Sequence, residues 1–553
     1  MPETLGKDDK PGKPCRKLPM KPAGWTVLVI LISAALAPTA PAFAGAKAPT
    51  AGRGGFGTAN WLVLAAYLTV MVAIGAYFSR RERSTDDFFL AGRRIPWWAA
   101  GLSIVGTGLS AITFMALPAK AYATDWTYFL GNIAPILVIP LVTAFYLPFY
   151  RRLNIRTAYE YLEKRFNLAA RLIGSGFYVC FQFLRMAVVL YLPALALSTV
   201  TGLNVYHCIL VMGLLCIVYT VMGGIEAVIW TDVLQVVVLF GSAVLCLCVI
   251  VAEVDGGLPA IISAGRQAGK LRLAKLDWDP TAAVLWVVVA GNFFNAFMPN
   301  TADQGVVQRY LTVRDLNAAR RAAWVSGLSV IPTSLLFFTL GTALWAFYQA
   351  HPQLLRPGLR NDEILPLFVI QQMPPGVAGL VIAGVFAAAM SSLDSSMNAV
   401  AAVVTTDVYR RFKPTADERR CLRLARWVTA ITGAVGMAAA LLMAGYHQQI
   451  KSLWDVFLAV LGLMGGALAG MFILGIFTRR AHAVGVCIGA AAGSTAAILA
   501  WQFSPLNSLL YGAVGLVTCV AVGYVASLLL PGRQNHLTGL TIHTPGQNHQ
   551  IFQ

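Results

Sequence analysis

A row of hydroxyl groups with one carboxylate lies inside an apolar stretch of this sequence, residues 386–398. On a helix, residues at positions i, i+3, i+4 and i+7 share one face. That face would carry four small or hydroxyl-bearing residues: Ala388, Ser391, Ser392 and Ser395. Hydroxyl and carbonyl oxygens are the ligands that hard cations prefer, and Asp394 adds a carboxylate beside them. The stretch therefore predicts a cation site on a buried helix.

The alternative for the same face is close helix packing, because small side chains let two backbones approach one another. Asp394 weighs against packing alone. A carboxylate at the depth of a membrane helix costs several kcal/mol, and such residues usually mark the paths of ions.

The composition indicates that this helix lies in a membrane. Of the 553 residues, 58% are hydrophobic and only 12% are charged, which is typical of a polytopic membrane protein and not of a soluble one. The net charge of +18 would suit nucleic-acid binding, but the basic residues form short clusters between apolar runs, and that is a topology signal. We expect the lipid bilayer as a partner, no nucleic acid, and no protein partner.

No residue pattern in the chain indicates catalysis. The nine cysteines show no metal or redox spacing, and Cys246 and Cys248 are separated by only one intervening residue. The seven histidines are scattered along the chain. Because no acid–base, nucleophilic or metal-ligand set is present, we do not expect an enzyme.

The N-terminal region has the three parts of a signal peptide. Residues 1–24 are basic, residues 25–36 form a short apolar core, and Ala42-Phe43-Ala44 matches a cleavage site. We expect a signal peptide at 1–44, followed by an extracytoplasmic segment at 45–57. The alternative is an uncleaved extra helix.

Thirteen stretches of about 20 residues are apolar enough to span a membrane. They are roughly 59–78, 97–122, 127–150, 172–200, 205–222, 226–252, 282–308, 322–349, 376–405, 424–446, 452–478, 482–502 and 507–530. Arg and Lys cluster after the first, third, seventh, ninth and eleventh spans, with Arg309 among them. The positive-inside rule then predicts a cell (inner) membrane protein with its mature N-terminus outside and its C-terminus in the cytoplasm. The membrane domain would cover 58–531, and the polar tail 532–553 is expected to be disordered.

Two of these spans are predicted to be broken. The second contains Gly106, Gly108 and Pro118, which weaken a helix. The seventh is unusually polar, with Asn292, Asn295, Pro299, Asn300, Asp303 and Gln304. Interrupted helices in corresponding positions of two halves indicate inverted repeats, here about 97–252 and 282–478, with a binding site at the membrane midplane.

Two further charged side chains lie within predicted spans. Arg185 lies near the middle of the fourth span, and its planar guanidinium matches a carboxylate through two parallel hydrogen bonds. The alternative is a structural ion pair with a buried acid such as Asp232. Asp232, at the start of the sixth span, could complete a cation site or could cap a helix together with Thr231.

Four stretches of the chain together resemble the sodium:solute symporter family. They are Ser84-Thr-Asp-Asp-Phe-Phe-Leu-Ala-Gly-Arg-Arg-Ile-Pro-Trp-Trp98, Trp230-Thr-Asp-Val-Leu-Gln235, Val307-Gln-Arg309 and Ser391-Ser-Leu-Asp-Ser395. The resemblance covers about residues 58–480. It implies an all-α fold of the leucine-transporter type, with a five-plus-five inverted repeat, one helix before the repeats and two after them.

The resemblance also implies one or two co-transported sodium ions. The ligands of the first would be the Gly106, Leu109 and Ala388 carbonyls and the Ser391 and Ser392 hydroxyls. A second ion, present in some members, would lie near Asp232, Ser391, Asp394 and Ser395. Asp394 stands where such members can have Ser, which changes the chemistry of that second site.

The residues around the second and fourth spans resemble the bacterial sialic acid branch of the family. There Ser110, Thr113 and Arg185 would hold the substrate carboxylate, and Asn132 stands in place of a Gln contact. We therefore expect a sodium-driven symporter for an organic anion, most specifically sialic acid. The alternatives are a monocarboxylate, an inorganic anion or a neutral sugar as the substrate, or a transporter-like sensor that does not transport.

Overall fold

The computed structural model describes residues 56–79, 84–355, 358–445, 453–532 and 537–544. The chain divides into two compact units, Met1–Thr50 and Ala51–Gln553, and the described residues all belong to the second unit. The expected signal peptide at 1–44 lies outside them. The described part is helical apart from turns, loops and one isolated bridge between Ile95 and Val313.

The helices differ widely in length, and the polar or Gly-containing stretches are divided into short pieces. The longer helices are α2 (Thr58–Ser79), α4 (Trp97–Gly108), α5 (Ala111–Ala123), α10 (Leu168–Thr201), α11 (Val205–Glu253), α12 (Gly257–Gln267), α13 (Leu285–Asn295), α16 (Leu316–Ala350), α18 (Val377–Val403), α20 (Glu418–Gly445), α21 (Leu453–Phe477), α22 (Ala483–Phe503) and α23 (Tyr511–Leu529). The shorter ones are α3 (Thr85–Leu90), α6 (Thr127–Ile133), α7 (Ile139–Leu141), α8 (Leu147–Arg152), α9 (Tyr159–Arg165), α14 (Phe297–Thr301), α15 (Gln304–Thr312), α17 (Ile364–Gln372) and α19 (Arg410–Phe412).

Both spans predicted to be broken are interrupted in the structure. Helices α4 and α5 are bent by 56° relative to each other, and Leu109 at the bend has φ −84° and ψ 87°, outside helical geometry. The seventh span consists of α13, α14 and α15, and Asp303, in extended conformation, is the N-cap residue that precedes α15. The helix ends created by these breaks leave backbone carbonyls and amides without helical partners.

Helix α11 combines the fifth and sixth predicted spans. Its 49 residues would extend about 73 Å at 1.5 Å per residue, more than twice the hydrocarbon thickness of a bilayer. Gly224 interrupts it with φ 53° and ψ −159°, a conformation that a residue with a side chain rarely adopts. The break divides α11 close to the predicted boundary.

The predicted number of thirteen spans is not confirmed. Among the described residues, nine helices are long and apolar enough to cross a membrane, and ten if the bent pair α4–α5 counts as one span. Two features account for part of the difference. Helix α11 counts once although Gly224 interrupts it, and the pieces of the seventh span are each too short to qualify.

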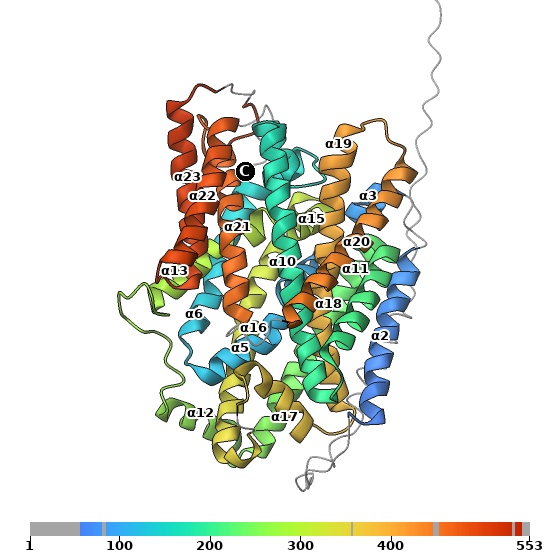
Figure 1. Cartoon of the computed structure of the whole chain (residues 1–553), viewed down its shortest axis with the longest axis vertical. Coiled ribbons are helices and arrows are strands. Elements are labelled where there is room, and N and C mark those ends of the chain that lie inside the picture. The colour runs from blue at the N-terminus through green and yellow to red at the C-terminus, as the bar shows by residue number, and fades with distance from the viewer. Residues whose placement is uncertain (1–55, 80–83, 356–357, 446–452, 533–536, 545–553) are drawn as a thin grey trace, which may run out of the picture. The chain divides into compact units, whose positions relative to one another are not determined.

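Helix α18 occupies the interior of the described unit, between α2, α10 and α11 (Figure 1). All of its residues except Val377 and Leu380 are buried. A Cβ at Gly384 would lie only 2.5 Å from Ser242 Oγ on α11, so the two helices pack closely. Asn60 of α2 caps its start, because Asn60 Oδ1 accepts hydrogen bonds from the Gly376 and Gly379 amides at 2.6 and 3.0 Å.

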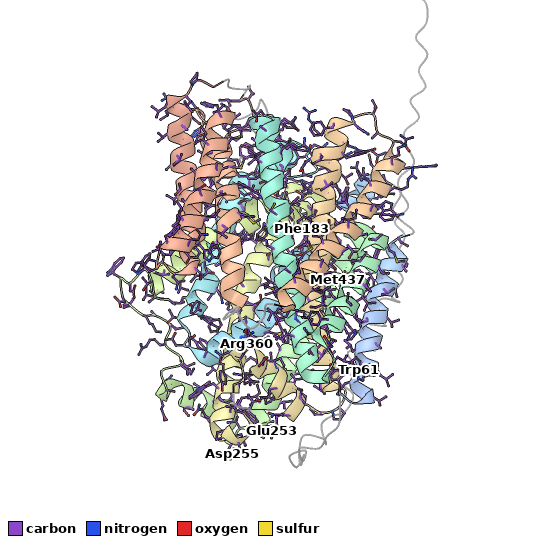
Figure 2. All side chains as sticks on the ribbon, in the orientation of Figure 1. Trp61, Phe183, Glu253, Asp255, Arg360 and Met437 are labelled. Atoms are coloured by element: carbon purple, nitrogen blue, oxygen red, sulfur yellow. The ribbon has the colours of Figure 1, made fainter. Side chains whose placement is uncertain are left out.

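Basic side chains in the segments between predicted spans donate hydrogen bonds to other such segments that are far away in the sequence. Arg151 donates to the Arg314 carbonyl at 2.6 Å, and Arg411 donates to Glu163 at 2.7 Å. Helix α19 lies at one end of the bundle in Figure 1 and α12 at the other, and Figure 2 shows Glu253 and Asp255 at the α12 end. Several of the loops predicted to face one side of the membrane are therefore in mutual contact.

The tail expected to be disordered contains an ordered turn. Within 537–544, Leu540 and Thr541 are buried, and the Leu540 carbonyl accepts a hydrogen bond from the Tyr161 hydroxyl at 3.0 Å. The Ile542 amide donates to the Ile476 carbonyl at 3.0 Å. The expectation of disorder is wrong for these eight residues, because they satisfy backbone groups at the end of α21 and bury apolar side chains.

Candidate cation and substrate site

The serine face of α18 lies against the break between α4 and α5. Ser391 Oγ is 2.9 Å from the Gly106 carbonyl and 3.2 Å from the Ala388 carbonyl, and Ser392 Oγ is 3.2 Å from the Thr107 carbonyl. Both hydroxyls donate into oxygen-rich surroundings, and both residues are 1% exposed. Carbonyl and hydroxyl oxygens at this spacing can serve together as ligands of a small hard cation.

The structure brings together four of the five residues predicted for the first cation: Gly106, Ala388, Ser391 and Ser392. The fifth, Leu109, lies at the bend itself, three residues beyond Gly106. The last carbonyls of α4 receive no hydrogen bonds from a following helical turn. The serine hydroxyls donate to them instead. A bound cation would replace those hydrogen bonds.

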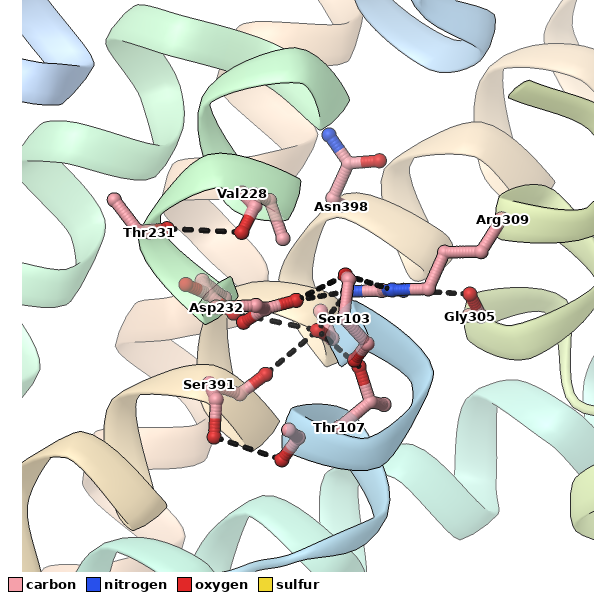
Figure 3. A network of polar contacts seen from close by, with 12 residues as sticks. Ser103, Thr107, Val228, Thr231, Asp232, Gly305, Arg309, Ser391 and Asn398 are labelled. Atoms are coloured by element: carbon pink, nitrogen blue, oxygen red, sulfur yellow. Dashed lines mark hydrogen bonds and ion pairs between the residues drawn. The ribbon is translucent and has the colours of Figure 1, made fainter. Parts of the chain in front are cut away.

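A second polar cluster lies one helical turn further along α18 (Figure 3). Ser395 Oγ is 3.0 Å from Thr107 Oγ1 and donates to the Ser391 carbonyl at 2.6 Å. Arg309 Nη2 of α15 donates to Ser395 Oγ at 2.6 Å and lies 2.8 Å from Asp232 Oδ2. This cluster therefore joins α4, α11, α15 and α18.

Asp232 and Arg309 form a fully buried ion pair. Both side chains are 0% exposed, and Ser103 Oγ lies 2.5 Å from both Arg309 Nε and Asp232 Oδ2. Arg309 was assigned to an inner basic loop, and that assignment is wrong because it lies inside the helical bundle. Asp232 does not cap a helix either, since it lies eight residues beyond the Gly224 break within α11.

Asp394 is the second buried carboxylate of this region. It accepts a hydrogen bond from the Tyr219 hydroxyl at 2.8 Å, and its other oxygen lies 3.3 Å from Ser395 Oγ. Its residue is 0% exposed, and among the described residues no Lys, Arg or His forms an ion pair with it. The Oδ1 atom of Asp232 is also buried without a partner in the described part. Of these two buried carboxylates, only that of Asp232 is paired with a guanidinium among the described residues.

The predicted substrate residue Arg185 also reaches the break in α4. Its Nη2 donates to the Thr107 carbonyl at 2.6 Å, and its Nη1 lies 4.0 Å from Asp303 Oδ2. The acid beside Arg185 is therefore Asp303, and the predicted alternative, Asp232, pairs with Arg309. Ser110 lies three residues past Thr107 and is 5% exposed.

The other two predicted substrate residues lie on α5 and α6, the next two helices along the chain. Thr113 is in the first turn of α5 and is partly buried. Asn132 is on α6, and its buried Nδ2 has no hydrogen-bond partner among the described residues. A buried amide donor without a partner is uncommon and suits a ligand contact.

The family can be decided from the sequence comparison. The model of the sodium:solute symporter family matches residues 88–493. The chain belongs to this family. The sodium/sialic acid symporter NanT of Aliivibrio fischeri is 41% identical over 481 residues, covering 87% of this chain and 95% of that protein. The sodium/sialic acid symporter SiaT of Proteus mirabilis is 40% identical over 482 residues, covering 87% of this chain and 97% of that protein.

A solved structure gives the same assignment. It is described as a substrate-bound outward-open state of a Na⁺-coupled sialic acid symporter with a novel Na⁺ site. Its TM-score with this chain is 0.82 at 39% identity, and the match covers 87% of this chain and all of the other. The chain is thus a multi-pass membrane protein of the sodium:solute symporter family, whose members are transporters and not enzymes.

Sequence reasoning missed several residues that organise this symporter's site. Asp303 was noted only as a polar residue of the seventh span, yet its Oδ1 accepts from the Gly305 amide at 2.7 Å and from the Tyr178 hydroxyl at 3.0 Å. Gln182 Nε2 is 3.5 Å from Asp303 Oδ2. The signal was present in the spacing, since Tyr178, Gln182 and Arg185 fall on one face of α10.

A second missed network lies near the start of α10. Arg171 Nη2 is 2.5 Å from Asp407 Oδ1, and Arg171 Nη1 is 2.6 Å from Glu163. Ser175 and Thr157 also donate to the Asp407 carboxylate, at 3.0 and 2.5 Å. These residues tie α10 and α9 to the end of the α18 span, and no short sequence motif joins them.

Proposed function

We propose that this chain imports sialic acid by sodium-driven symport with alternating access. The observation that carries the proposal is the Thr107 carbonyl, which accepts from Ser392 Oγ at 3.2 Å and from Arg185 Nη2 at 2.6 Å. One backbone oxygen thus connects the predicted sodium site with the predicted carboxylate-binding guanidinium. If either Ser392 or Arg185 moves, the hydrogen bonding of the Thr107 carbonyl at the α4 break changes.

The first sodium ion would be bound by the Gly106, Leu109 and Ala388 carbonyls and by the Ser391 and Ser392 hydroxyls. Their present hydrogen bonds hold α18 against α4 only through neutral dipoles. A cation would bind the same oxygens more strongly and would fix the α4 break for substrate binding. Sialic acid would then bind through Ser110, Thr113, Asn132 and Arg185.

A second cation is supported by the charge count around Asp394. Asp232 and Asp394 carry two negative charges in a region where Arg309 supplies one positive charge, and the Asp232 Oδ1 atom has no partner in the described part. A sodium ion near Asp232, Ser391, Asp394 and Ser395 would neutralise the excess. Two sodium ions with one monoanion move one net positive charge, and one sodium ion gives electroneutral transport.

The finer features of the fold belong to the same proposal. The interruptions in α4–α5 and α13–α15 support inverted repeats at about 97–252 and 282–478, as in transporters of the leucine-transporter type. The contacts among basic loops support a common cytoplasmic side. We propose a location in the cell (inner) membrane with the mature N-terminus outside and the C-terminus inside.

The deciding experiment is uptake of labelled sialic acid into proteoliposomes that contain the purified protein. An inward sodium gradient should drive accumulation above the outside concentration, and equal sodium on both sides should abolish it. Unlabelled lactate, iodide and glucose test the other substrates by competition. Accumulation that ignores sodium, or sialic acid uptake displaced by glucose, would contradict the proposal. Binding without any net uptake would indicate a sensor.

A further inference from the structure

The counter-ion of Arg185 is held in an unusual way. Asp303 Oδ2 is 4.0 Å from Arg185 Nη1, which is close enough for charge attraction and too far for a hydrogen bond. Both side chains are buried, with 8% and 5% exposure. The guanidinium of Arg185 therefore has a negative charge nearby, but none of its N–H groups donates a hydrogen bond to that carboxylate.

Asp303 is stabilised without help from Arg185. Its Oδ1 accepts from the Gly305 amide at the start of α15 and from the Tyr178 hydroxyl. Its Oδ2 faces Gln182 Nε2 at 3.5 Å. A carboxylate at a helix N-terminus is further favoured by the helix dipole. Arg185 can consequently turn toward a ligand without leaving Asp303 as an unsatisfied buried anion.

We propose that Asp303 is a positioning residue for the substrate: it is the resident counter-ion of Arg185 and limits how tightly the site holds a carboxylate. Burying an unpaired guanidinium in the membrane is costly, and Asp303 removes that cost while no substrate is bound. The same negative charge repels the arriving carboxylate, so binding is weakened and release is eased. This inference rests on the proposed role of Arg185.

The test compares neutral replacements that keep the helix cap. Asp303→Asn and Asp303→Ser both retain an oxygen that can accept from the Gly305 amide. We expect the sialic acid Kd, measured by titration calorimetry in sodium buffer, to fall about tenfold, which corresponds to about 1.4 kcal/mol. In proteoliposomes KM and kcat should fall together, because the substrate is bound more tightly and released more slowly.

Two control variants separate the possible failures. Asp125→Asn also removes one negative charge, from a carboxylate paired with Lys275 at 3.1 Å, and should leave the Kd unchanged. Arg185→Gln should weaken sialic acid binding at least tenfold. If Arg185→Gln binds normally, the proposed carboxylate role of Arg185 fails and the inference fails with it.

If Arg185→Gln loses affinity while both Asp303 variants bind like the unmodified protein or more weakly, only the counter-ion proposal is overturned. Thermal unfolding of each variant completes the comparison. If neither Asp303→Asn nor Asp303→Ser folds, the proposal is also overturned, because the charge of Asp303 would then be needed for the fold itself.

Discussion

Arg309 Nη2 lies 2.8 Å from Asp232 Oδ2, and neither side chain is exposed. The pair connects α15 with α11, and Ser103 and Ser395 add hydrogen bonds from α4 and α18. Together with these two serines, the guanidinium and the carboxylate connect four helices around the predicted cation site. The relationship is a tertiary one, since 77 residues separate the two side chains in sequence.

Removing one member of this pair should destabilise the protein strongly. Asp232→Asn would leave the Arg309 charge buried without its partner, at a cost of about 3–5 kcal/mol. Thermal unfolding in sodium-free detergent buffer should show a clearly lowered Tm. The double variant Asp232→Asn/Arg309→Gln, which has no net buried charge at the pair, should unfold at a higher temperature than the single variant. A single variant as stable as the unmodified protein would contradict this prediction.

The two serines that face the α4 break should control sodium affinity. Ser391→Ala and Ser392→Ala each remove one hydroxyl ligand, and we expect the sodium concentration for half-maximal uptake to rise about tenfold, or about 1.4 kcal/mol. The matched control is Ser329→Ala on α16, whose hydroxyl donates only to the Val325 carbonyl of its own helix. An unchanged sodium dependence in both site variants would rule out this cation site.

Asp394 should determine the number of sodium ions coupled to each substrate. Asp394→Asn keeps the shape of the side chain and removes the charge that has no basic partner among the described residues. We expect the flux ratio of sodium to sialic acid to fall from about two to about one, as expected from the loss of one compensated charge. Tyr219→Phe removes the hydroxyl that donates to Asp394 and contacts Cys216 Sγ at 4.0 Å but leaves the Asp394 charge in place, so it should retain the original ratio. A ratio of one in the unmodified protein would refute the second site.

Asn60 should stabilise the start of the helix that carries the serines. Its Oδ1 is the acceptor for both the Gly376 and the Gly379 amide, so Asn60→Leu would leave two amides unsatisfied and cost about 1–2 kcal/mol. Asn60→Asp keeps the acceptor and places a negative charge at a helix N-terminus, where it is favoured. The Tm of Asn60→Asp should therefore be close to that of the unmodified protein, and the Tm of Asn60→Leu should be lower. The reverse order would exclude a capping role.

Local spacing was sufficient for the part of the site that one helix supplies. Ser391, Ser392 and Ser395 share a face because a helix repeats every 3.6 residues, and that holds wherever the helix packs. Glycine and polar residues likewise marked the breaks at α4–α5 and α13–α15, because both disfavour an uninterrupted membrane helix. The resemblance to the family added the Gly106 and Leu109 carbonyls at the α4 break as the predicted partners of the serine hydroxyls.

The pairing of charges could not be predicted in this way. Arg309 follows an apolar span and resembles an inner-loop cation, and Asp303 appears as one of several polar residues. The sequence offered Asp232 as a candidate acid for Arg185 and gave no way to choose Asp303 in its place. The choice depends on which helices are neighbours and on how far each side chain reaches across the interface.

The sequence by itself determined a polytopic membrane protein, its broken helices and the hydroxyl face of α18, because composition and helical periodicity are local properties. Only the tertiary structure decided that Asp232 pairs with Arg309, that Asp303 accompanies Arg185, and that residues 537–544 pack against α21. The physical reason is the same in each case. A buried charge or a buried backbone group must find a partner, and the partner that lies within reach is set by the packing of helices distant in sequence.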